Sequence, residues 1–126
     1  MSVPGLFSLV GKTVVVTGGG KGIGRGISDA MARCGANVVV SGRGALALDE
    51  TVRGVQALGA QALAVVGDIT RSDDRDRLIA ATLERFGAID GWVNNAGSAS
   101  PADVGPLDTI GEAQWDRVVD LNLKAA

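Results

Sequence analysis

The feature that most constrains this chain is a glycine-rich turn directly after a short apolar strand. Val14 to Val16 form an unbroken β-branched run, as expected for a strand covered on both faces. The run ends at Thr17, and a glycine-rich segment follows from Gly18 to Gly24. Apolar residues then recur at helical spacing until Gly35, a residue typical of the position just past a helix end. The pattern predicts a strand, a glycine turn and a helix.

The same alternation is repeated along the chain. Strands are predicted near Asn37 to Ser41, Ala62 to Val66 and Gly91 to Val93, and helices from about Ala45 to Leu58 and Ser72 to Phe86. Such alternation is typical of parallel strands joined by crossover helices. We therefore expect a Rossmann-type α/β fold with a doubly wound parallel sheet and strand order 3-2-1-4.

The third helix and the segment after the fourth strand have further features. In the helix near Ser72 to Phe86, the apolar residues Ile79, Leu83 and Phe86 share a face. The stretch from Ala96 to Pro106 is rich in glycine, proline and serine, which predicts a loop.

A final helix is expected to begin at a capping box formed by Thr109 and Glu112. One stripe of this helix combines apolar residues with an amide: Trp115, Val118, Val119 and Asn122. The apolar members favour burial, and a buried amide needs hydrogen-bond partners. Asn122 is therefore a candidate functional residue.

Composition excludes several classes of partner and reaction. The net charge of -2, without a basic cluster, argues against nucleic-acid binding, and no apolar run approaches the ~20 residues of a membrane span. Cys34 is the only cysteine and the start lacks a secretory signal, so we expect a cytoplasmic protein. The chain has no histidine and no tyrosine, which removes catalytic triads, histidine metal sites and a phenolic general acid; no metal is expected.

The glycine turn has the context of a phosphate site. Glycines let the backbone approach a pyrophosphate, whose charge is met by the free N–H groups of the helix start. The spacing differs from G-x-G-x-x-G, and it is not a P-loop because Gly22, and not serine or threonine, follows Lys21. The alternative is a turn that needs glycine only for its geometry.

Four segments in order resemble the N-terminal half of the short-chain dehydrogenase/reductase family, from about Lys12 to the end of the chain. They are Thr17-Gly18-x-x-x-Gly22-Ile23-Gly24, Asp68-Ile69, Asn94-Asn95-Ala96-Gly97 and Asp120-Leu121-Asn122. The resemblance implies an oxidoreductase that transfers hydride between a nicotinamide cofactor and a small carbonyl or alcohol substrate. It also implies a homo-oligomer, a dimer or a homotetramer.

The resemblance assigns roles to individual residues. Asn122 would be catalytic and hold a proton-relay water, Asp68 would meet the adenine amine, and Asn95 would contact the ribose side of the cofactor. For Asp68 and the asparagine pair, an ordinary turn is the alternative. The expected cofactor-binding residues are Gly18, Gly20, Lys21, Gly22, Ile23, Gly24, Arg43, Asp68, Ile69, Asn95, Ala96 and Gly97.

The end of the second strand predicts which cofactor is used. An NAD enzyme places an acid there to bind the ribose 2'-hydroxyl, whereas this chain has Ser41, Gly42 and Arg43. Arg43 and Lys21 can together meet a 2'-phosphate, a combination similar to that of NADP-preferring members of the family. We predict NADP, with NAD possible; the alternative is that both are ordinary solvated charges.

In the family, a serine and a Tyr-x-x-x-Lys pair complete the catalytic set. With no tyrosine here, we expect residues 1–126 to form a single dinucleotide-binding Rossmann domain that is truncated, or described only in part, at its C-terminal side. A non-catalytic dinucleotide-binding module is the second hypothesis. A methyltransferase is the third, but Gly42 stands where that class would need an acid.

Overall fold

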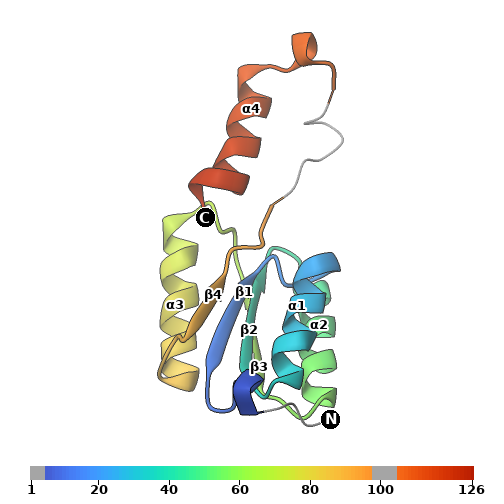
Figure 1. Ribbon diagram of the computed structural model, residues 1–126. Helices are drawn as coiled ribbons and strands as arrows, with labels where there is room; N and C mark the ends of the chain where they lie inside the picture. Colours follow the sequence, from blue (N-terminus) through green and yellow to red (C-terminus); the bar gives the residue numbers. More distant parts are fainter. Residues whose placement is uncertain (1–4, 98–104) are drawn as a thin grey trace.

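Four parallel strands form a single sheet in the computed structural model, which describes residues 5–97 and 105–126 (Figure 1). The strands are β1 (Thr13–Thr17), β2 (Asn37–Gly42), β3 (Ala62–Val66) and β4 (Gly91–Val93). Their order is β3-β2-β1-β4, and each neighbouring pair is parallel. The predicted order 3-2-1-4 is confirmed.

Helices cover both faces of the sheet. The helices α1 (Gly22–Arg33) and α2 (Ala45–Ala57) lie on one face, and α3 (Ser72–Phe86) lies on the other (Figure 1). Val14 and Val16 join the core on the α1 and α2 side, whereas Val15 joins the core on the α3 side. Alternate residues of a strand point to opposite faces, so the middle of a strand between two helical layers is apolar on both faces.

The face that α3 buries differs from the predicted one. Leu78 and Thr82 are fully buried, whereas Ile79 and Leu83 are 40% and 45% exposed. Phe86 packs against the core as expected. The buried threonine satisfies its hydroxyl inside the helix, where Oγ1 donates to the carbonyl of Leu78 at 2.7 Å. Thr82 can therefore occupy a core position that the apolar pattern assigned to its neighbour.

The helix α4 (Glu112–Val119) begins two residues later than its predicted capping box would place it. Thr109 lies instead in a preceding 3-10 turn, where its hydroxyl donates to Pro106 O at 2.7 Å. Gly111 is the N-cap residue, and its N–H donates to Gln114 Oε1 at 2.7 Å. The capping-box prediction was wrong because Thr109 hydrogen-bonds back into its own turn.

The apolar stripe of α4 is only partly covered. Trp115 is 63% exposed, so its predicted burial is wrong for this chain. In Figure 1, α4 stands beyond the sheet and covers neither of its faces, which explains the exposure. A π-helical turn, Asp120–Lys124, continues from α4 and carries Asn122. Most of the predicted loop from Ala96 to Pro106 lies outside the described residues.

Candidate functional site

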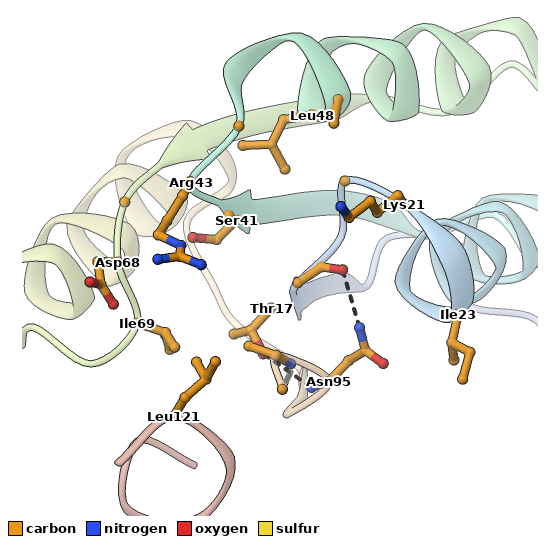
Figure 2. Close-up of a pocket in the computed structure, with 18 residues that line it drawn as sticks. Thr17, Lys21, Ile23, Ser41, Arg43, Leu48, Asp68, Ile69, Asn95 and Leu121 are labelled. Carbon is orange, nitrogen blue, oxygen red and sulfur yellow. Dashed lines mark hydrogen bonds between the residues drawn. The ribbon is translucent and has the colours of Figure 1, made fainter. Parts of the chain in front are cut away.

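A cavity of about 480 Å³ opens at the carboxyl ends of the strands. The carboxyl ends of parallel strands meet at one edge of the sheet, which is where open α/β folds bind ligands. Figure 2 shows Arg43 and Asp68 on one side and Lys21 and Ile23 on the other. The segment after each strand contributes to the walls, which are formed by Thr17, Gly18, Gly20, Lys21, Ile23, Ser41, Gly42, Arg43, Gly44, Ala47, Leu48, Gly67, Asp68, Ile69, Asn95, Ala96, Gly97 and Leu121.

Ten of the twelve residues predicted to bind a cofactor are among these wall residues. The other two, Gly22 and Gly24, belong to the first turn of α1. Sequence reasoning missed Ala47 and Leu48 of α2, although the helix after a strand necessarily starts at this edge of the sheet. It also did not assign Leu121 to the site, although this residue lies in the Asp120-Leu121-Asn122 segment that carried the resemblance.

The glycine turn has the geometry that a backbone phosphate site requires. Gly18 has a φ of +66°, which side-chain-bearing residues rarely adopt, and a Cβ there would lie 2.9 Å from Ala96 Cα. Lys21 is the N-cap residue of α1, and no side chain in the described part of the chain caps the helix. The first N–H groups of α1 therefore lack a side-chain partner and are suited to bind an anion.

Thr17 connects the glycine turn to the segment after β4. Its Oγ1 accepts hydrogen bonds from the N–H groups of Asn95 and Ala96, each at 3.0 Å, and donates to Val93 O at 3.2 Å. The side chain of Asn95 adds a bond of 3.1 Å from Nδ2 to Gly18 O. Two walls of the cavity are thus fixed to each other by a buried hydroxyl.

Replacing Thr17 with valine is expected to destabilise the protein by about 1–3 kcal/mol, because the Ala96 N–H loses its partner, and the Asn95 N–H and the Val93 carbonyl keep only the bond between them. Valine has nearly the same shape as threonine, so the loss reports the hydroxyl. Thr17→Ser keeps the oxygen and should lose less. Urea denaturation measures the free energy of unfolding of Thr17→Val, Thr17→Ser and the wild type. Equal stability of Thr17→Val and the wild type would contradict the role given to this hydroxyl.

Asp68 forms a turn and also lines the cavity. Its Oδ1 accepts the Thr70 hydroxyl at 2.6 Å and the Thr70 N–H at 2.9 Å. These two hydrogen bonds, together with the positive charge of Arg43, lower the pKa of Asp68 below its usual value. The carboxylate is therefore ionised at neutral pH. The turn role, considered as an alternative from the sequence, coexists with a position in the wall of the cavity.

Two cationic side chains reach the cavity from different elements. Lys21 and Arg43 are both exposed, and neither takes part in a salt bridge or side-chain hydrogen bond within the described part of the chain. Ser41, Gly42 and Arg43 follow the valines of β2, so the end of this strand carries no acidic residue. Lys21 and Arg43 thus place positive charge on two walls of the cavity.

Asn122 lies beside the segment after β4. Its Nδ2 donates to Val118 O at 2.9 Å, and its Oδ1 occupies the space that a Cβ at Gly97 would fill. The side chain is exposed, in contrast to the burial expected from its stripe. Gly97 is a wall residue of the cavity, so the π-helical turn places Asn122 next to the site.

The doubly wound sheet, the uncapped glycine turn and the cavity at the strand ends define a Rossmann-type fold. The model of the short chain dehydrogenase family matches residues 12–126, and the chain belongs to this family. Its members are oxidoreductases that bind a nicotinamide dinucleotide, NAD or NADP. The resemblance seen in the sequence is therefore confirmed.

Individual known proteins are also similar in sequence to this chain. Gluconate 5-dehydrogenase of Gluconobacter oxydans is 39% identical over 125 residues, which are 99% of this chain and 48% of that protein. The 3beta-hydroxysteroid dehydrogenase 1 of Eggerthella lenta is 41% identical over 118 residues, 91% of this chain and 43% of the relative. The chain spans less than half the length of these relatives.

Solved structures agree. A short-chain dehydrogenase/reductase of unknown function from Caenorhabditis elegans, crystallised with cofactor, superposes with a TM-score of 0.87 at 39% identity, covering 93% of this chain and 45% of that one. In the part of this chain that the structure describes, no helix combines the length and apolar character needed to cross a membrane. The same residues contain no cluster of three or more potential metal ligands.

Proposed function

We propose that this protein binds NADP(H) in the cavity at the strand ends and takes part in hydride transfer to or from a carbonyl or alcohol substrate. The observation that carries the cofactor choice is a pair of cations, Lys21 and Arg43, that form no salt bridge among the described residues and line a cavity where the end of β2 carries no acid. A 2'-phosphate would meet both charges, whereas a free ribose diol would find no carboxylate at the end of β2.

The residues present fit such a cofactor. The close approach of Gly18 to Ala96 leaves room for backbone and none for a side chain, and the uncapped N–H groups of α1 face the same edge of the sheet. In this proposal, Gly18, Gly20 and Ile23 hold the diphosphate, Asp68 meets the adenine amine, and Asn95 contacts the ribose. The remaining predicted cofactor-binding residues shape these contacts: Gly22, Gly24, Ile69, Ala96 and Gly97.

When bound, the nicotinamide supplies the hydride chemistry. Asn122 is proposed to hold a water of the proton relay, since its amide lies beside Gly97 at the edge of the cavity. The chain contains neither tyrosine nor histidine, so the proposal assigns no general acid among these 126 residues. We further propose a cytoplasmic homo-oligomer, with the exposed Trp115 as part of the contact between copies.

Titration of the full chain with NADPH and NADH tests the cofactor. The signal is energy transfer from Trp92 and Trp115 to the reduced nicotinamide. S-adenosylmethionine is added as a competitor, and we expect that it does not displace NADPH. We expect saturable binding, with NADPH favoured over NADH by about tenfold or more, as two charge-assisted contacts would give. Binding of S-adenosylmethionine in place of NADPH would refute the proposal.

Turnover is the second test. NADPH consumption in the presence of a panel of ketones distinguishes an oxidoreductase from a module that binds the dinucleotide without chemistry. Tight NADPH binding by the intact protein, with no oxidation against any ketone, would support the binding module and contradict the catalytic half of the proposal.

A further inference from the structure

Arg25, on the first turns of α1, lies outside the cavity wall and contacts the back of the glycine turn. Its guanidinium donates to Gly20 O at 2.8 Å and, through Nε, to Thr51 Oγ1 at 3.2 Å. The same group forms a salt bridge with Glu50 at 3.0 Å and a longer contact with Ala47 O at 3.4 Å. Arg25 thus links α1, α2 and the turn.

Thr51 holds the neighbouring carbonyl. It is buried in α2, and its hydroxyl accepts from Arg25. The hydroxyl donates to Gly19 O at 2.8 Å, the shorter of its two contacts with carbonyl oxygens, the other being Ala47 O at 3.2 Å. The carbonyls of two consecutive glycines, Gly19 and Gly20, are therefore both anchored toward α2. Neither Arg25 nor Thr51 belongs to the cavity wall, whereas Gly20 and Lys21 do.

Anchoring these carbonyls sets the direction of the next N–H groups. In a trans peptide the C=O and N–H bonds point in opposite directions. The N–H groups of Gly20 and Lys21 must then point away from the Arg25 and Thr51 side. A turn that meets phosphate needs this arrangement, because a carbonyl oxygen that faced the anion would repel it, whereas an N–H group attracts it.

We propose that Arg25, acting through Gly20 and together with Thr51, is a positioning residue that keeps the N–H groups of the glycine turn directed at the phosphates of the bound dinucleotide. The inference rests on the proposed function, since it presumes a dinucleotide in the cavity. It predicts that Arg25 affects the affinity for phosphate groups without touching the ligand.

The test compares two ligands in the full chain. NADPH contains the phosphates, whereas adenosine contains the base and ribose alone and is followed by NMR shifts. Arg25→Met keeps much of the aliphatic length but removes the donors. We expect it to bind NADPH about tenfold more weakly, as the loss of one charge-assisted hydrogen bond would give, and to bind adenosine as the wild type does.

Two further variants complete the design. Glu50→Gln is the matched control, because it removes the partly exposed salt-bridge partner and leaves the contact between Arg25 and the turn; its NADPH affinity should be unchanged. Thr51→Val removes the second anchor and gives an independent test should Arg25→Met fail to fold. We expect it also to weaken NADPH and spare adenosine.

The possible outcomes separate the two proposals. Folded Arg25→Met or Thr51→Val protein that binds NADPH within twofold of the wild type overturns this inference alone. An equal loss for NADPH and adenosine also overturns it, because that result indicates general damage to the site. A wild-type protein that binds no dinucleotide overturns the proposed function, and this inference with it.

Discussion

Replacing Gly24 with alanine is expected to lower both the stability and the NADPH affinity of this protein. A Cβ at Gly24 would overlap the carbonyl oxygen of Gly18 and lie 2.7 Å from Asn95 Nδ2. Both neighbours belong to the glycine turn and the segment fixed to it, so neither can move without disturbing the cavity. Overpacking of this kind costs about 1–3 kcal/mol. We expect NADPH affinity to fall by more than tenfold, because α1 is displaced from the turn.

The chain supplies a matched control in the same helix. A Cβ at Gly26 would meet no atom of residues 5–97 or 105–126 within 4 Å. Alanine is favoured over glycine in a helix interior by about 0.5–1 kcal/mol, so Gly26→Ala should raise the melting temperature slightly and leave NADPH binding intact. Thermal melts and fluorescence titration measure both variants. A Gly24→Ala protein with wild-type stability and affinity would show that the close packing of α1 against the turn is not needed.

Replacing Arg43 with alanine is expected to separate the two nicotinamide cofactors. Arg43 lies at the cavity without a salt-bridge partner in the described residues, so its charge is available for a 2'-phosphate. Loss of a charge-assisted contact of about 1.5–3 kcal/mol corresponds to roughly 10- to 100-fold weaker NADPH binding. NADH lacks the 2'-phosphate, and its affinity should change little.

Arg53→Ala is the control for the change in net charge. Arg53 is exposed on α2 and does not line the cavity, so this variant loses the same charge elsewhere on the surface. Its affinities for NADPH and NADH should match those of the wild type. If Arg43→Ala binds both nucleotides with unchanged affinities, the assignment of Arg43 to the 2'-phosphate fails.

Local patterns were sufficient to predict the order and type of the elements. The predicted strands became β1 to β4, and the parallel order followed from strands alternating with helices. Periodicity was less reliable for the face of a helix. In α3 it selected Ile79 and Leu83, while the structure buries Leu78 and Thr82, because a threonine that bonds its own helix can enter the core.

In the candidate site, too, some residues could be predicted from local sequence and others could not. Segments directly after strands, such as Asp68 and Asn95, were predictable because a parallel sheet brings its carboxyl ends to one edge. The anchor formed by Arg25 and Thr51 was not predictable. Arg25 and Thr51 are 26 residues apart in the chain and meet only when α1 packs beside α2.

The sequence by itself determined the alternation of strands and helices, the glycine turn after β1 and the two cations that follow β1 and β2, because each depends on neighbouring residues. Tertiary structure alone decided that Thr17 would bind the segment after β4 and that Arg25 would anchor Gly20. These contacts join residues that are distant in the chain, and their geometry exists only once the helices have packed on the sheet.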